Sequence, residues 1–358
     1  MNNTVSFLLN STLSFFAIVF LAVLSGGCSH STPPEEQPDG LQYVTPEEVG
    51  FSSSALESAK QLAQQSGYAA VMAAYDGKVF FSWGDVSRNF LAHSIRKPFM
   101  SSLYGIHVGS GEIDLAQTVG DLGIDDIAPV LTEAEKQATV RELLQARSGI
   151  YHEAAAEDSM MMALRPARGS HPHGTCFYYN NWDFNVAGVI FRQKTGLDIF
   201  EAFKNEIADP IGMEDFSTAN CFYQYETNKS EHPAYSFRMS ARDMLRFGVL
   251  YQQGGKWLDR QIISPEWITE STTTYSVMDS ASGLGYGYMW RTIPPGSALA
   301  QQVGSTGFYH TGVGVHALIV LPALKLVIVE RVDTDGATWV DPGEAGLEIG
   351  LMIINARN

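Results

Sequence analysis

Apolar positions with strand-like spacing are concentrated near both ends of the chain. Residues 68–75 form one apolar run and residues 78–83 form another, with Asp76-Gly77 between them. An Asp-Gly pair between two such runs is a strong signal for a β-hairpin. Strand character returns late in the sequence, over residues 286–293, 315–321 and 326–332. We therefore expect strands in both terminal parts of the folded chain.

Helical periodicity prevails between these two regions. Leu56, Ala59, Leu62 and Ala63 fall on one helical face after a capping box that begins at Ser54, which predicts an early helix. Further helices are expected over residues 94–107, 140–146, 182–195, 199–208 and 241–252, with a closing helix over residues 346–354.

Strands of one sheet must lie together, so the pattern predicts a mixed α/β (α+β) fold with an antiparallel sheet built from the N- and C-terminal segments. Helices would flank this sheet, and a mostly helical region would be inserted. In a domain spanning residues 45–358, we assign residues 45–105 and 285–358 to the α/β part and residues 106–284 to the helical part. A chain of 358 residues, 45% of them hydrophobic, can bury a core of this size.

The N-terminus has the pattern of an export signal. Residues 12–24 are almost wholly apolar but too few to span a bilayer, which predicts a signal peptide over residues 1–27. The segment from Leu24 to Cys28 resembles a bacterial lipoprotein box, in which Cys28 would carry the lipid. No Lys or Arg precedes the apolar run, so a plain cleaved signal or a short membrane anchor stays open. Residues 28–44 would form a tether, and we expect an exported protein at the outer membrane, facing the periplasm or the cell surface.

The net charge, the cysteines and the histidines indicate which binding partners, disulfides and metal sites to expect. The formal net charge is -16, which opposes binding to nucleic acid. With Cys28 at the anchor, Cys176 and Cys221 remain, and in an oxidising compartment they could form a disulfide or stay separate buried thiols. His171-Pro172-His173 lacks a third ligand at diagnostic spacing, so we expect neither a metal nor another cofactor.

The candidate chemistry begins at Ser94-Ile95-Arg96-Lys97, the only Ser-x-x-Lys in the chain. A serine hydroxyl needs an adjacent base to become a nucleophile, and on a helix Lys97 would lie one turn from Ser94 on the same face. By itself this tetrapeptide is most often an ordinary helix start. Two further motifs follow in order, Tyr179-Asn180-Asn181 and His310-Thr311-Gly312.

Together these motifs resemble the serine β-lactamase and penicillin-binding-protein superfamily over residues 45–358. The most similar branch holds class C β-lactamases, family VIII carboxylesterases, D-amino-acid peptidases and 6-aminohexanoate-dimer hydrolases. The resemblance also rests on Val140–Leu144 with Ser148-Gly149, on Gly174-Thr175, Phe177 and Gly188 around the tyrosine motif, on residues 240–248, and on Pro322 twelve residues after His310.

The resemblance implies roles for the residues of the first two motifs. Ser94 would be the nucleophile and Lys97 its base. Tyr179 would complete the proton relay as a phenolate stabilised by Lys97 and would help deacylation. Asn181 would hold Lys97 and the substrate carbonyl, and the backbone amides of Ser94 and Val313 would form the oxyanion hole.

The third motif would bind substrate along a strand at the edge of the cleft. Thr311 and Gly312 would contact it directly, since glycine permits a close approach to the backbone. The family's β-lactamases usually carry lysine in place of His310, and histidine is only partly charged near neutral pH. The cleft would then lack a permanent cation, and we expect uncharged esters to be cleaved better than carboxylate-bearing β-lactams.

The sequence therefore predicts an exported serine hydrolase that acts through an acyl-enzyme on small ester or amide substrates. Two alternatives stay open. One is a D-stereospecific peptidase or DD-carboxypeptidase acting on peptidoglycan peptides, and the other is a non-catalytic pseudoenzyme that only binds. The expected partners are a small-molecule substrate and, through the lipid anchor, a membrane, while the sequence indicates no oligomeric state.

Overall fold

The computed structural model describes residues 40–336 and 339–358. The expected signal peptide and Cys28 lie outside these residues. The expected tether is described only from residue 40 on, and there Gln42–Tyr43 (β1) pairs in parallel with Lys78–Gly84 (β3). Within the described ranges, no helix combines the length and the apolarity needed to cross a bilayer.

One large sheet runs through the molecule in the order β1-β3-β2-β15-β14-β13-β12-β11-β10, antiparallel throughout except for β1 with β3. Its other strands are β2 Tyr68–Tyr75, β10 Ser276–Asp279, β11 Leu284–Tyr286, β12 Arg291–Ile293, β13 Gly307–Gly312, β14 His316–Leu321 and β15 Leu326–Val332. Three two-stranded sheets are β4 Phe90–Leu91 with β7 Arg238–Met239, β5 Phe222–Gln224 with β6 Ala234–Ser236, and β8 Lys256–Trp257 with β9 Arg260–Gln261.

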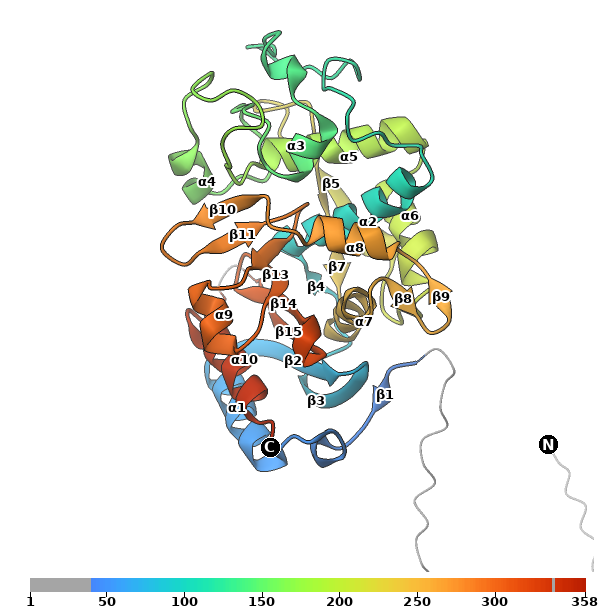
Figure 1. Cartoon of the computed structure of the whole chain (residues 1–358), viewed down its shortest axis with the longest axis vertical. Helices are drawn as coiled ribbons and strands as arrows, with labels where there is room; N and C mark the ends of the chain where they lie inside the picture. The colour runs from blue at the N-terminus through green and yellow to red at the C-terminus, as the bar shows by residue number, and fades with distance from the viewer. Residues whose placement is uncertain (1–39, 337–338) are drawn as a thin grey trace, which may run out of the picture. The chain divides into compact units, whose positions relative to one another are not determined.

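The helices are α1 Ser53–Gln65, α2 Arg96–Gly109, α3 Val140–Leu144, α4 Ser159–Leu164, α5 Asn181–Thr195, α6 Ile199–Phe203, α7 Ala241–Gln252, α8 Pro265–Ser271, α9 Ala298–Val303 and α10 Ala345–Asn355. Figure 1 shows α1 and α10 together against one side of the large sheet. Helix α7 packs on its other side, towards the mostly helical part of the chain.

The two faces of β2 show why this sheet is covered on both sides. Val71 and Ala73 pack into the core under α1 and α10, while Met72 and Ala74 pack into the larger core with α7. Successive strand residues point to opposite faces, so an apolar residue at every position buries both. The expected fold, an antiparallel sheet from both ends of the chain flanked by helices with a helical insertion, is confirmed.

Several element boundaries agree with the sequence pattern, and others do not. The hairpin between β2 and β3 turns at Asp76 and Gly77, whose φ angles of 50° and 80° suit the tight turn that the Asp-Gly pair predicts. Helix α1 is capped by Ser52, whose hydroxyl accepts from the Ala55 amide, and not by Ser54.

The single strand expected over residues 286–293 is wrong. The chain reverses there, with the Gly287 amide donating to the Trp290 carbonyl, and forms the antiparallel pair β11 and β12. A Cβ on Gly287 would lie 2.2 Å from the Ser271 carbonyl oxygen, so this turn accepts only glycine. The sheet also extends upstream of residue 285, because β10 and β11 belong to it.

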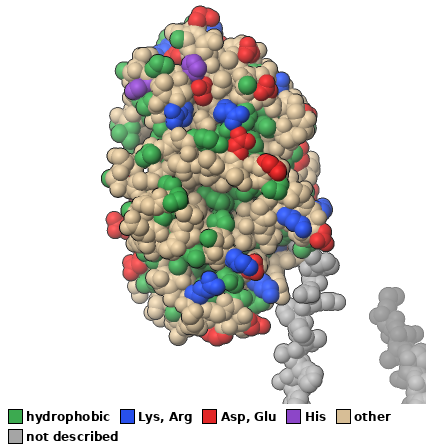
Figure 2. Space-filling view, viewed as in Figure 1, with side chains coloured by type: hydrophobic (Ala, Val, Ile, Leu, Met, Phe, Trp, Pro, Cys, Tyr) green, Lys and Arg blue, Asp and Glu red, His purple; other side chains and the backbone are tan. Residues whose placement is uncertain are grey.

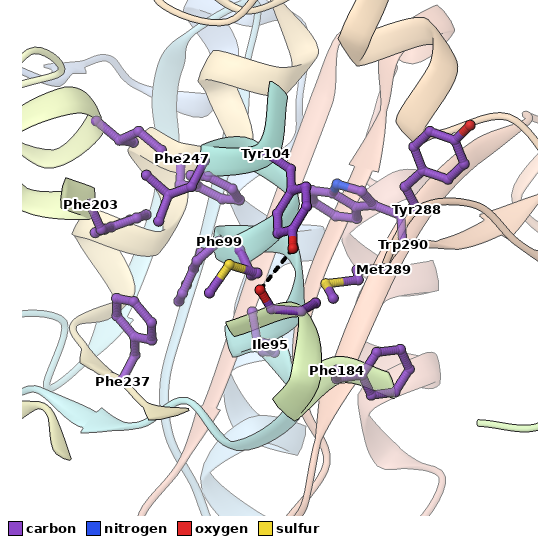
Figure 3. Packing of buried hydrophobic residues seen from close by; sticks show 14 of the residues in the cluster. Ile95, Phe99, Tyr104, Phe184, Phe203, Phe237, Phe247, Tyr288, Met289 and Trp290 are labelled. Carbon is purple, nitrogen blue, oxygen red and sulfur yellow. Dashed lines mark hydrogen bonds between the residues drawn. The ribbon is translucent and has the colours of Figure 1, made fainter. Parts of the chain in front are cut away.

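Helix α2 is anchored in the larger core by its aromatic side chains (Figure 3). Phe99 packs edge to face with Phe247 of α7 at 4.9 Å between ring centroids, and it also contacts Phe203 and Phe237. Tyr104 donates a hydrogen bond of 2.8 Å to the Ala187 carbonyl of α5. This helix therefore gives the residues at its N-terminal end a fixed position.

The disulfide that the sequence left open is not formed. Cys176 and Cys221 are both free thiols in the structure. The Cys176 thiol donates to the Phe177 carbonyl at 3.6 Å, and the Cys221 thiol donates to the Ser217 carbonyl at 3.8 Å. The alternative of two separate thiols is the one that the structure has.

Candidate active site

Ser94 and Lys97 meet at the N-terminal end of α2. Ser94 lies in the 3-10 turn His93–Ile95, and Lys97 is the second residue of the helix that follows directly. Lys97 Nζ donates a hydrogen bond of 3.0 Å to Ser94 Oγ. The structure thus brings together the serine and the base that the Ser-x-x-Lys spacing predicts.

The environment of Lys97 favours a neutral amine. Its side chain is 1% exposed, and burial lowers its pKa well below the ordinary lysine value, with Arg96 and Arg291 lowering it further. Asp158 acts in the opposite direction. Among the described residues, no carboxylate forms an ion pair with Lys97. A lysine with a lowered pKa can accept a proton at neutral pH, which is what a general base must do.

Tyr179 lies beside this pair. Lys97 Nζ is 4.7 Å from the centre of the Tyr179 ring, over its face. The Tyr179 hydroxyl lies near Ser94 and Arg291 without a hydrogen bond of normal geometry. Burial raises its pKa by more than Arg291, Ser94 and Arg96 lower it, so the phenol is protonated. The expected phenolate stabilised by Lys97 is therefore wrong for the free site, because Lys97 lies over the ring and its own charge is disfavoured.

Asn181 is the first residue of α5, and its side chain has another hydrogen-bond partner than the expected Lys97. Its side-chain amide donates to the Ala156 carbonyl, and no hydrogen bond to Lys97 is formed in the described structure. Its Oδ1 is buried and has no partner among the described residues. The neighbouring Trp182 fixes the start of the helix by donating from Nε1 to Asp126 at 2.7 Å. Asn181 therefore holds the segment before α4, and its Oδ1 remains available as an acceptor.

Strand β13 passes directly beside the turn that carries Ser94. A Cβ on Gly312 would lie 2.8 Å from the Ala92 carbonyl oxygen and 3.5 Å from the Ser94 amide nitrogen, so this close approach requires glycine. Thr311 and Gly312 are partly buried, and Val313 is exposed. The structure thus places the end of β13 next to Ser94, where the sequence predicts substrate binding and the oxyanion hole.

His310 is fully buried and neutral. Its Nδ1 donates to the Thr311 carbonyl at 2.9 Å, and its Nε2 is buried without a partner in the described part of the chain. Burial lowers the pKa of His310 well below its ordinary value, and Arg291 and Lys97 lower it further. The expectation of a partly charged imidazole near neutral pH is therefore wrong.

Two arginines complete the site, and sequence reasoning missed both as site residues. Arg291 of β12 is paired with Tyr309 of β13, and its guanidinium lies 5.4 Å from the centre of the Tyr179 ring. Arg96 is buried, donates to Asn185 at 2.9 Å and lies over the Tyr235 ring at 4.3 Å. Only the pairing of β12 with β13 could have revealed Arg291. Arg96 stands inside the Ser-x-x-Lys motif, which gives that position no role.

Cationic groups dominate the electrostatics of the site. Within residues 40–336 and 339–358, no ion pair joins a carboxylate to Arg96, Lys97 or Arg291. Buried polar atoms without a hydrogen-bond partner in the same ranges are Arg96 Nη1, Tyr179 Oη, Asn181 Oδ1, Tyr235 Oη, Tyr286 Oη, Arg291 Nε and His310 Nε2. Unpartnered buried polar groups are costly, so these atoms are candidates for hydrogen bonds to water or to a polar ligand. From the sequence we did not expect a permanent cation here, and Arg291 is one that lies beside Tyr179 and His310.

The histidines of the His171-Pro172-His173 segment have other partners. His171 Nδ1 contacts the Ser170 and Tyr151 hydroxyls, and His173 Nδ1 contacts Glu142. The described residues contain no group of three or more His, Cys, Asp or Glu side chains placed to hold a metal ion. On the face seen in Figure 2, basic side chains are scattered among acidic ones rather than gathered into one patch.

Comparison with known proteins agrees with this fold. The sequence model of the Beta-lactamase family matches residues 56–342, which is most of the chain. The chain therefore belongs to the Beta-lactamase family, and the resemblance read from its motifs is confirmed. No curated protein matches it by sequence.

Solved structures of this fold are similar over most of their length. A D-stereospecific amidohydrolase from Streptomyces sp. is 17% identical, with 83% of this chain and 98% of that chain covered and a TM-score of 0.62. The D-alanine carboxypeptidase AmpC from Burkholderia cenocepacia is 17% identical, with 85% and 100% covered and a TM-score of 0.61. A penicillin-binding protein homolog from Caulobacter crescentus is 16% identical, with 86% and 98% covered and a TM-score of 0.60. At these identities the likeness establishes the β-lactamase/transpeptidase-like fold, and the neighbours include hydrolases.

Proposed function

We propose that this protein is a serine hydrolase that forms an acyl-enzyme at Ser94 on small ester or amide substrates. The observation that carries the proposal is the hydrogen bond of 3.0 Å between Ser94 Oγ and a buried Lys97. A lysine amine held neutral by burial and by neighbouring cations is a base of the kind that serine requires. The pseudoenzyme alternative gives no reason for this costly arrangement.

Acylation begins with transfer of the Ser94 proton to the neutral Lys97 amine as Oγ attacks the substrate carbonyl. Negative charge then develops on the carbonyl oxygen, and the amides of Ser94 and Val313 are the candidate donors that stabilise it. The leaving oxygen or nitrogen must gain a proton as its bond to the carbonyl carbon breaks. Tyr179 is suited to pass on that proton, because burial keeps its phenol protonated.

Hydrolysis of the acyl-enzyme requires the same groups in the reverse order. After Tyr179 has given its proton to the leaving group, the proton held by Lys97 restores the phenol. The neutral Lys97 amine can then take a proton from an incoming water and pass it to Ser94 Oγ. The water oxygen attacks the acyl carbonyl, and Ser94 recovers its hydrogen. No cofactor takes part in this sequence.

Covalent labelling tests the proposal. Intact-mass measurement with a serine-directed fluorophosphonate should show one adduct on the wild-type protein and none on Ser94→Ala. The matched control is Ser101→Ala, which removes a buried hydroxyl from the same helix and should label like the wild type. Equal labelling of wild type and Ser94→Ala would refute the nucleophile assignment. Substrates are then screened with p-nitrophenyl esters, penicillins and D-Ala-D-Ala peptides.

One observation favours a second candidate, a D-stereospecific peptidase or DD-carboxypeptidase. Arg291 places a permanent cation beside His310 and Tyr179, and no carboxylate of the described chain pairs with it. A carboxypeptidase substrate ends in a free carboxylate, which such a guanidinium can bind with charge-assisted hydrogen bonds. Cleavage of a D-Ala-D-Ala peptide but not of its C-terminal amide would support this candidate, and equal cleavage of both would exclude it.

A further inference from the structure

The residue directly before the nucleophile has a strained backbone. His93 has a φ of 48°, in the left-handed region that only a few per cent of residues other than glycine adopt. Such strain persists only where the surrounding structure fixes it, and it is concentrated at functional sites. A sharp, strained turn at a nucleophilic serine also presents its hydroxyl away from the backbone, as the nucleophile turn of another hydrolase fold does.

The side chain of His93 is fixed from two sides. Its Nε2 is joined to Thr334 Oγ1 by a hydrogen bond of 2.8 Å. Its ring lies 5.4 Å from the ring of His316, measured between centroids. His316 is itself held, because its Nδ1 accepts from the Val332 amide at 3.2 Å. Burial and Arg331 lower the pKa of His93 to about 4, so the imidazole in this arrangement is neutral near neutral pH.

Thr334 is presented to His93 by a short segment, Asp333–Asp335, that we call the Thr334 clasp. Ion pairs secure it on both sides of the threonine. Asp333 pairs with Arg88 at 2.7 Å, and Asp335 pairs with Arg238 at 2.6 Å. Arg88 and Arg238 belong to the chain around β4 and β7, so the clasp is tied to the same region that leads into the nucleophile turn.

The strand that enters the turn is fixed as well. Buried Arg331 donates from Nη2 to the carbonyls of Phe90 at 3.0 Å and Leu91 at 3.2 Å. On the other side of the turn, a Cβ on Gly312 would lie 3.0 Å from His93 Cβ, so β13 leaves His93 little room to shift. The backbone that leads into Ser94 is therefore held by contacts to Phe90, Leu91 and His93.

We propose that His93 is a positioning residue that, through Thr334 and His316, sets the location of the Ser94 hydroxyl and amide for acyl transfer. The inference rests on the proposed function of Ser94. Reaction rates of oriented groups fall steeply when the attacking atom moves by a fraction of an ångström to an ångström. Loosening the His93 ring should therefore slow attack by Ser94 while the groups that bind substrate stay in place.

Three variants test this role. Thr334→Val removes the hydroxyl that holds His93 with little change in shape, and Thr334→Ser restores it. His93→Gly accepts the left-handed backbone without steric cost but lacks the ring. The maximal rate of fluorophosphonate labelling should fall at least about tenfold in Thr334→Val and His93→Gly, with the half-saturating probe concentration within about twofold of the wild type. Thr334→Ser should label at close to the wild-type rate.

Thermal unfolding of each variant separates positioning from folding, and labelling is compared on the folded fraction at a temperature below every transition. A purely structural role predicts a lower transition temperature with an unchanged labelling rate, which would overturn the inference. Ser94→Ala is measured in the same assay. Labelling that survives in Ser94→Ala refutes the proposed function itself. If Ser94→Ala is not labelled while Thr334→Val and His93→Gly are labelled at the wild-type rate, only the role of His93 is refuted. If His93→Gly does not fold, the labelling rate of Thr334→Val alone decides.

Discussion

Replacing Arg291 with glutamine should change which substrates the enzyme prefers. The substitution keeps a polar side chain, shorter than that of arginine, and removes the cation that lies beside Tyr179 and His310. A hydrogen bond to a charged partner is worth about 1.5–3 kcal/mol, and each 1.36 kcal/mol is a factor of ten in rate. The kcat/KM for a carboxylate-bearing substrate should therefore fall by about 10- to 150-fold relative to an uncharged analogue.

The ratio between two substrates is the quantity to measure, because Arg291 also lowers the pKa of Lys97. Its loss raises that pKa, protonates more of the base at neutral pH and slows every substrate alike. A matched pair with the same acyl group, one bearing a free carboxylate and the other its methyl amide, removes this shared effect. Arg192→Gln is the control, since it removes an exposed cation about 16 Å along α5 from Asn181 and should leave the ratio unchanged.

The pH dependence of the same ratio tests the source of the charge. If the cation is Arg291, the wild-type ratio should stay flat from about pH 6 to about pH 9, because arginine does not titrate there and His310 stays neutral. A ratio that rises as the pH falls through about 6.5 would instead assign the charge to an imidazole. An unchanged ratio in Arg291→Gln would refute the anion-binding role.

Three further outcomes are expected. Lys97→Ala and Tyr179→Phe should each lower kcat by about a hundredfold or more. Because both residues serve one relay, the loss of kcat in the double variant should be much smaller than the product of the two single losses. A loss equal to that product would mean that the two residues act independently. Cys28→Ser should be released from membranes as a soluble exported form, whereas unchanged membrane partition would favour an uncleaved apolar anchor. His107, hydrogen-bonded to two carboxylates including Glu206, has a raised pKa, so its stabilisation is full below about pH 6.5 and is lost as the pH rises through that raised value. The loss of thermal stability in His107→Gln should therefore be larger at pH 5.5 than at pH 9 (about these values), and an equal loss at both would contradict the linkage.

The sequence predicted best what depends on local geometry. Ser94 and Lys97 are three residues apart, so a helix alone brings them together, and the Asp76-Gly77 turn follows from the two residues that form it. Arg291 could not be found in this way, because its place in the site depends on the register between β12 and β13. The single strand expected over residues 286–293 concealed that register, because the chain reverses at Gly287, where a Cβ would lie 2.2 Å from the Ser271 carbonyl oxygen.

The charge states of the site residues were the second feature that the sequence did not predict. For His310 the reference pKa gave a partly charged imidazole, and the family resemblance implied a phenolate at Tyr179 next to Lys97 as the base. Burial is the largest influence on all three, and it favours the neutral form of each. Burial of a given side chain is a property of tertiary packing, which apolar periodicity along the chain indicates only for the core-facing residues.

The same cations that keep Lys97 neutral create a conflict for an anionic substrate. Arg96 and Arg291 lower the pKa of Lys97, and a bound carboxylate beside Arg291 would offset part of that effect. Since Lys97 must be deprotonated to accept the Ser94 proton, the acid limb of the kcat profile should lie at higher pH for a carboxylate-bearing substrate than for its uncharged analogue. Measuring kcat against pH for the matched pair tests this, and the difference should disappear in Arg291→Gln. Coincident acid limbs in the wild type would mean that the bound carboxylate does not act on Lys97, and the substrate's charge would then have to lie elsewhere in the cleft.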